Sequence, residues 1–144
     1  MQTFLPHRSF RRSVEVLDWK RLGKQRVECK QLLNALLRPE TAKGWKNHPA
    51  AKMWKGHELP LCRYAIKVCE EWRTRGYKDE QLQYFNALYK ELKLKGYKYI
   101  LPDWLGKKRF HASHRSNLLR KDQEHYGQFG WKEGPDLPYH WPVN

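Results

Sequence analysis

The segment Arg21–Glu28 carries polar side chains inside an otherwise apolar helical pattern. At about 100° per residue, Arg21, Gln25 and Glu28 form one ridge at i, i+4 and i+7. Gln25 also falls within the arc of the apolar positions that follow it, such as Leu32. Burying polar groups without partners costs several kcal/mol, about 2–7 for a neutral group. Either these three side chains pair with one another on a partly exposed helix, or this part of the helix faces a cleft.

Glu28 is the candidate catalytic group of this segment. Four cations lie close to it in the sequence, namely Lys20, Arg21, Lys24 and Arg26, and they would hold its carboxylate ionised. An isolated anion in a cationic cleft is typical of an active site, whereas the alternative is a structural ion pair.

A second polar cluster lies in the basic segment 107–121. Its residue types favour contacts with phosphates, and the candidate DNA-binding residues here are His111, His114, Arg115, Asn117, Arg120 and Lys121. The alternative is a solvated basic helix without a partner. The two histidines lack a further ligand at a characteristic spacing, so we predict no metal site. Trp131, Tyr139 and Trp141, in an aperiodic stretch, are candidates for contact with an unstacked base, although most aromatic side chains belong to cores.

Composition sets the class of protein. The 144 residues carry a net charge of +14, with 14% aromatic residues and 40% hydrophobic residues. The charge indicates a polyanionic partner, RNA or DNA, and the hydrophobic content excludes a disordered basic tail. Nothing resembles a signal peptide or a membrane span, so we expect a soluble, cytoplasmic monomer from a bacterium or phage, with three buried cysteine thiols. Phosphate-binding loops, nucleophile elbows and acidic metal triads are missing, which argues against kinases, hydrolases and two-metal nucleases.

The hydrophobic periodicity predicts an all-α fold. We expect a single compact domain over residues 1–144, with three to four helices, an extended amino terminus and an irregular aromatic carboxy-terminal tail. Strand signals are weak and confined to residues 2–5 and 97–101. The expected helices cover Val14–Leu37 with Ser13 as cap, Leu59–Arg75, Asp79–Leu94 with Asp79 as cap, and Ala112–His125.

Several words of the sequence resemble one family. They are RLGKQRVE (21–28), NHPA (47–50), MW (53–54), HASHRSNLLRKDQEHY (111–126) and FGW (129–131). Their order is similar to that of the pyrimidine-dimer DNA glycosylase (endonuclease V-like) family, in a branch that opens MQTFLP. The resemblance implies a helical enzyme whose terminal α-amine attacks the deoxyribose carbon bearing a damaged base. It also implies an imine intermediate and strand cleavage by β-elimination, which is AP-lyase activity.

The resemblance also assigns roles to residues. Glu28 matches the essential glutamate, Arg26 an arginine before it, and Arg21 and Gln25 the preceding positions. The family exposes a small second residue after methionine removal, whereas this chain has Gln2, which should leave Met1 in place. The catalytic candidates are therefore Glu28, Met1 and Gln2, with either the Met1 amine or Glu28-activated water as nucleophile.

The implied substrate is double-stranded DNA with a damaged or modified pyrimidine, bound through Arg21, Lys24, Gln25 and Arg26 as well as the basic segment. No metal or organic cofactor is implied. The alternative is a noncatalytic nucleic-acid-binding protein that uses the basic helix and the aromatic tail.

Overall fold

The computed structural model describes residues 2–143, which form seven α-helices. These are α1 (Phe10–Val16), α2 (Trp19–Leu37), α3 (Pro49–Trp54), α4 (Glu58–Thr74), α5 (Gln81–Leu94), α6 (Lys108–Lys121) and α7 (Gln123–Tyr126). Short 3-10 helices cover Pro39–Thr41, Lys43–Asn47 and Gly127–Phe129. Residues 2–143 contain no β-strand, which confirms the all-α prediction, but three to four helices was too few. No helix in this range is long and apolar enough to cross a membrane.

The predicted first helix is two helices because two separate caps start them. Ser9 accepts a hydrogen bond from the Arg12 backbone and begins α1, and Asp18 accepts one from the Arg21 backbone and begins α2. Leu17 between them is extended. Ser13, the predicted cap, is buried inside α1, where its hydroxyl donates to the His7 carbonyl.

The other helix predictions differ mainly at their ends. α4 and α5 lie where the periodicity predicts them, and each is followed by a glycine with positive φ, Gly76 and Gly96. The N-cap of α5 is Glu80 and not the predicted Asp79, although Asp79, one residue earlier, does accept from the Leu82 backbone at 2.8 Å. The predicted helix Ala112–His125 is wrong as one element, because Asp122 caps α7 separately. α3 was not predicted.

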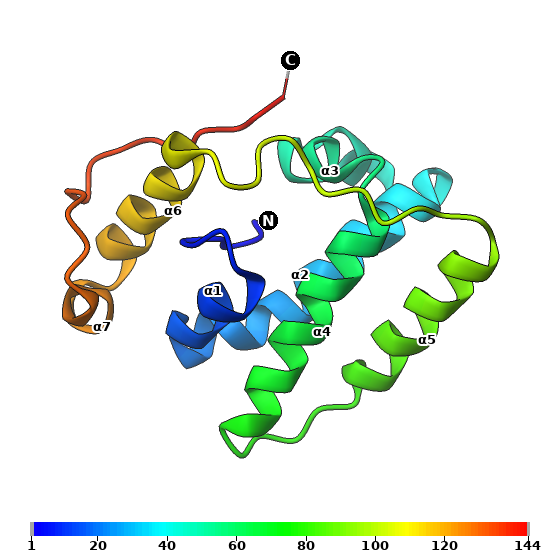
Figure 1. Cartoon of the computed structure of the whole chain (residues 1–144), viewed down its shortest axis with the longest axis horizontal. Helices are drawn as coiled ribbons and strands as arrows, with labels where there is room; N and C mark the ends of the chain where they lie inside the picture. Colours follow the sequence, from blue (N-terminus) through cyan, green and yellow to red (C-terminus); the bar gives the residue numbers. More distant parts are fainter. Residues whose placement is uncertain (1, 144) are drawn as a thin grey trace.

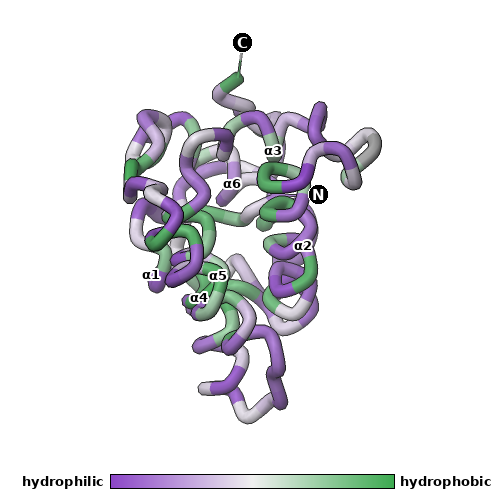
Figure 2. Tube along the Cα trace, turned by 90° about the vertical axis from the view of Figure 1, so that its right-hand side faces the viewer, coloured by the Kyte–Doolittle hydropathy of each residue, from purple (hydrophilic) through white to green (hydrophobic). Residues whose placement is uncertain are grey.

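The helices enclose the amino-terminal segment. Figure 1 shows this segment between α6 on one side and α2 and α4 on the other, with the carboxy-terminal tail running along α6. α2 packs against α4, which packs against α5 and α1. Figure 2 shows hydrophobic positions of α4 and α5 gathered inside the molecule, while many outer loops are hydrophilic.

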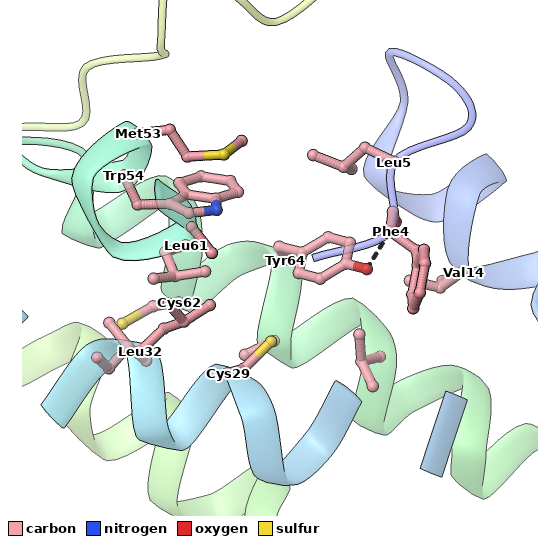
Figure 3. Close-up of a cluster of buried hydrophobic side chains, with 14 of the residues drawn as sticks. Phe4, Leu5, Val14, Cys29, Leu32, Met53, Trp54, Leu61, Cys62 and Tyr64 are labelled. Carbon is pink, nitrogen blue, oxygen red and sulfur yellow. Dashed lines mark hydrogen bonds between the residues drawn. The ribbon is translucent and has the colours of Figure 1, made fainter. Parts of the chain in front are cut away.

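The buried side chains form one core cluster, to which the amino-terminal segment contributes Phe4 and Leu5. Figure 3 shows Tyr64 of α4 directing its hydroxyl toward Phe4, above Cys29 and Leu32 of α2. All three cysteines are free and buried, as predicted. The core therefore includes the very start of the described chain.

Candidate functional site

Residues 2–6, which we call the amino-terminal arm, are held by side chains from four helices. Gln2, Thr3, Phe4 and Leu5 are all buried. The part of the chain that the structure describes offers the arm no strand to pair with, so side chains must satisfy its backbone groups. A side-chain contact to the arm comes from the Trp54 indole of α3, which donates to the Thr3 hydroxyl at 3.0 Å. The predicted extended amino terminus is present, but it lies inside the protein.

Gln25 of α2 holds the arm at two points. Its side-chain oxygen accepts from the Phe4 backbone at 3.0 Å, and its nitrogen donates to the Gln2 carbonyl at 2.7 Å. Tyr64 donates to the Phe4 carbonyl at 2.7 Å, and burial raises the pKa of this hydroxyl well above its usual range. Tyr64 therefore remains a neutral donor. Gln25, the polar residue within the apolar arc of α2, therefore hydrogen-bonds the backbone of the arm.

His111 and His114 of α6 hydrogen-bond the two backbone groups of Leu5. Nδ1 of His114 accepts from the Leu5 backbone at 2.9 Å, and Nδ1 of His111 lies 2.7 Å from the Leu5 carbonyl. Nε2 of His111 accepts from the Gly106 backbone, so its Nδ1 carries the proton. Burial lowers the pKa of His114 to about 3, which keeps it a neutral acceptor. Both predicted DNA contacts therefore point into the protein, at the arm.

Glu28 lies where the arm begins. The backbone N–H of Gln2 donates to its carboxylate at 2.9 Å, and the Gln25 side-chain nitrogen lies 3.3 Å from the same oxygen. Met1, the other predicted catalytic residue, lies outside the described residues. Among residues 2–143, the predicted ladder is only partly formed, because Arg21 pairs with Asp18 at 3.0 Å instead of Gln25.

Glu28 lies in a cavity of about 660 Å³, which we call the Glu28 cleft. Its walls combine cations with aromatic rings: Gln2, Phe4, Trp19, Lys20, Arg21, Lys24, Glu28, Lys121, Tyr139 and Trp141. Three of the predicted DNA-binding residues, Arg21, Lys24 and Lys121, thus meet there from α2 and the end of α6. A carboxylate among cations and rings suits a nucleotide, whose phosphates, sugar and base need different partners.

Arg26 lies away from the Glu28 cleft. Its guanidinium donates to Asp79 at 2.6 Å and lies over the Trp72 ring, 5.2 Å from the centroid. The Asp79 side chain is fully buried. Burial alone would raise the pKa of Asp79, but hydrogen bonds from Leu82 and Arg26 outweigh it and lower this pKa. In this structure Arg26 joins α2 to the loop before α5.

The rest of the predicted basic footprint on α6 holds the tail. Arg115 forms a two-pronged ion pair with Glu133 at 2.8 and 2.9 Å and donates to the Pro6 carbonyl. Asn117 is buried and donates to the Leu137 carbonyl, and Arg120 donates to the Pro135 carbonyl at 3.0 Å. The predicted irregular tail is ordered because α6 binds its backbone.

The aromatic rings of the tail divide into two groups. Trp131, one of the three rings predicted to contact a base, packs on Tyr126 with ring centroids 5.7 Å apart and does not line the Glu28 cleft. Tyr139 and Trp141 do line it. Tyr139 also contacts His114 edge-on, with centroids 5.6 Å apart. The end of the tail therefore lines the cleft together with residues of α2.

Sequence reasoning missed three contributors. Trp19 is 56% exposed at the start of α2, next to Asp18, and the cap would have placed it there. His48 caps α3 through Nδ1, which accepts from the Ala50 backbone, and its ring meets Trp141 edge-on at 5.8 Å. Burial lowers the pKa of His48, and the charge of Glu28 opposes this shift. Tyr64 gave no signal, because its apolar neighbours mark it as core.

Comparison with known families places the first half of the chain in one of them. Residues 1–82, more than half of the chain, match the family model described as pyrimidine dimer DNA glycosylase. The chain belongs to the pyrimidine dimer DNA glycosylase family. This confirms the resemblance drawn from the sequence. No curated protein and no solved structure gives a significant match.

The glycosylase family match covers only part of the Glu28 cleft. It includes the arm, α2 and Glu28, and it ends before α6 and the tail. Lys121, Tyr139 and Trp141 therefore belong to a portion of this glycosylase family member that lies beyond the matched segment.

Proposed function

We propose that this protein is a DNA glycosylase with AP-lyase activity that removes a damaged pyrimidine from double-stranded DNA. The observation that carries the proposal is the hydrogen bond between the Gln2 backbone and Glu28 at the floor of a basic, aromatic cleft. Membership of the pyrimidine dimer DNA glycosylase family supports it. We further propose that residues 1–144 work as one domain, since the arm is bound by α2, α3, α4 and α6 together.

The proposed nucleophile is the α-amine of the chain. Consecutive Cα atoms are about 3.8 Å apart, so an amine on Met1 is one residue from the Gln2 nitrogen that Glu28 binds. An α-amine is less basic than a lysine, so more of it is unprotonated at neutral pH. Its lone pair forms a bond to C1′ of the deoxyribose, and the electron pair of the C1′–N1 bond leaves with the base. Opening of the sugar ring then yields an imine, which permits β-elimination of the 3′ phosphate.

Glu28 acts in this scheme as the acid/base group. Its carboxylate accepts a proton from the attacking amine and stabilises the positive charge that develops on the sugar. The surrounding cations, Lys20, Lys24 and Lys121, bind the flanking phosphates. The rings of Trp19 and Trp141 offer flat surfaces for an unstacked base, which an enzyme of this kind must extrude from the duplex.

The test uses two duplexes, one with a cyclobutane pyrimidine dimer and one with an abasic site, each with and without borohydride. Borohydride reduces an imine to a stable amine and so traps a covalent protein–DNA adduct. We expect strand cleavage of both duplexes and a trapped adduct on each. Mass spectrometry of the adduct, together with that of the free protein, identifies the attached residue.

Two outcomes would contradict the proposal in different ways. Base release without a trapped adduct would replace the amine with water activated by Glu28. Tight binding of both duplexes without any chemistry would favour the second candidate, a noncatalytic DNA-binding protein, which the clustered cations of the cleft also suit.

A further inference from the structure

Gln2 carries a buried amide group that the protein itself leaves unsatisfied. The side-chain oxygen accepts from the Thr3 backbone at 2.9 Å, which identifies the other atom as the nitrogen. That Nε2 is buried without a hydrogen-bond partner, and it is the one side-chain atom in this situation among the side chains that the structure describes. A buried unpaired donor costs free energy, and such a group calls for an explanation.

The position of Gln2 points to a ligand as the missing partner. Gln2 is 6% exposed and forms part of the wall of the Glu28 cleft. Its backbone is fixed on both sides, by Glu28 at the N–H and by Gln25 at the carbonyl. The terminal torsion of a glutamine side chain is soft, so the carboxamide can turn toward the cleft while its backbone stays in place.

The residues around Gln2 in the Glu28 cleft indicate that the acceptor for its Nε2 is a neutral oxygen. Lys20, Arg21 and Lys24 supply cations for phosphates in the same cleft, whereas Gln2 offers a neutral donor beside the catalytic carboxylate. In a pyrimidine nucleotide the atom bonded to C1′ is N1, and the carbonyl oxygen O2 is on the adjacent carbon. A donor placed beside the nucleophile at C1′ therefore meets O2.

We infer that the Gln2 carboxamide donates a hydrogen bond to O2 of the departing pyrimidine; this inference rests on the proposed function. When the C1′–N1 bond breaks, its electron pair enters the base, and part of the negative charge falls on O2. An N–H donor at this position stabilises that charge more than it stabilises the neutral carbonyl, so it lowers the barrier to base release. The attacking nucleophile supplies the electron pair for the new bond to C1′, and its proton leaves to Glu28.

Two substitutions separate this role from a structural one. Gln2→Met removes the donor and also the oxygen that accepts from Thr3. Gln2→Glu keeps the acceptor for Thr3 but places a second oxygen where the donor was. Both keep a bulky second residue, so processing of Met1 is unchanged. Gln83→Met, at an exposed position of α5, is the matched control.

The measurement is the single-turnover rate of base release from dimer duplex, divided by the rate of adduct trapping on abasic duplex. The abasic duplex has no base to expel, and trapping on it also reports that each variant is folded. We expect the ratio to fall about tenfold to a hundredfold in Gln2→Met. It should fall further in Gln2→Glu, with Gln83→Met equal to the wild type.

Other results would overturn the inference. Equal losses on both duplexes, or better base release by Gln2→Glu than by Gln2→Met, would assign Gln2 to holding the arm. If wild-type protein traps on abasic DNA but releases no base from the dimer, the role at O2 of that base is wrong. A wild type inactive on both duplexes would instead refute the proposed function itself.

Discussion

The backbone N–H of Gln2 lies 2.9 Å from the carboxylate of Glu28, although 26 positions separate the two residues in the chain. This contact brings the start of the chain to the one carboxylate among the residues lining the Glu28 cleft. It also gives that carboxylate a fixed direction, because the Gln25 side chain contacts the same oxygen. The arrangement makes Glu28 the first residue to test.

Replacing Glu28 with Gln should abolish base release without weakening DNA binding. The amide keeps the size and a hydrogen-bond acceptor but cannot take a proton, and loss of general acid/base catalysis costs about 10²- to 10⁴-fold in rate. Single-turnover base release and fluorescence anisotropy measure the two quantities. Glu40→Gln, at an exposed position, is the matched control. Full activity in Glu28→Gln would remove this carboxylate from the mechanism.

Lys24 and Arg26 should behave differently, although both were predicted to bind DNA. Lys24 lines the Glu28 cleft, so Lys24→Ala should weaken DNA binding and reduce the slope of log affinity against log salt by about one. Arg26→Ala should leave that slope unchanged. Its effect should be on the free energy of unfolding, which falls by about 1–3 kcal/mol because the buried Asp79 carboxylate loses the nearer of its two arginine partners and keeps only Arg73. A smaller salt slope in Arg26→Ala would restore it as a DNA contact.

The ion pair of Asp79 should make stability depend on acid pH. The pKa of Asp79 is lowered in the folded state, so the unfolded chain takes up this proton first as the pH falls. The contribution of Asp79 is complete above the unfolded value, about 3.9, and is lost as the pH falls through the folded pKa. Urea unfolding should therefore show a gap between wild type and Asp79→Ala that narrows below about pH 4.

Asp103→Ala is the control for that series, because Asp103 is exposed and should show no such gap. A gap that stays constant down to the lowest pH at which the protein folds would mean that Asp79 stabilises the fold through packing alone.

His114 should be needed to hold the arm. His114→Leu leaves the Leu5 N–H buried without an acceptor, which should lower the free energy of unfolding by about 1–3 kcal/mol. His114→Asn places an oxygen near the former Nδ1 and should recover part of the loss. Adduct trapping on abasic DNA should follow the same order. If His114→Leu has the same free energy of unfolding and the same rate of adduct trapping as the wild type, the hydrogen bond between His114 and Leu5 is dispensable.

Much of the helical framework follows from local sequence signals. The periodicity between Leu59 and Arg75 and the stop at Gly76 predict α4 closely, because packing of one apolar face and a positive φ are local requirements. The break at Leu17 was missed because apolar residues continue at roughly helical spacing from Val14 in α1 to Leu22 in α2. The carboxylate cap at Asp18 decides the boundary, and a cap is a weaker signal than a stripe.

The sequence predicts only some residues of the site, for a different reason. Glu28 and Gln25 stand out because polar residues interrupt a buried stripe. In the sequence, His111 and His114 resemble phosphate contacts because they lie among arginines and lysines. Only the fold shows that both side chains hydrogen-bond the backbone of Leu5. A partner more than 100 positions away leaves no trace in local composition. Three rings of the tail were predicted to contact a ligand, but that Tyr139 and Trp141 line the cleft while Trp131 does not depends on how α6 binds the tail.

The order of synthesis gives the arm an unusual history. Leu5 leaves the ribosome more than 100 residues before His111 and His114, so its two backbone groups have no permanent partners until α6 has been made. During that interval the arm has only the partners that α2, α3 and α4 supply. The arm therefore completes its hydrogen bonds only after α6 has emerged, and the Glu28 cleft, which also needs Lys121, Tyr139 and Trp141, is among the last parts of the protein to be assembled.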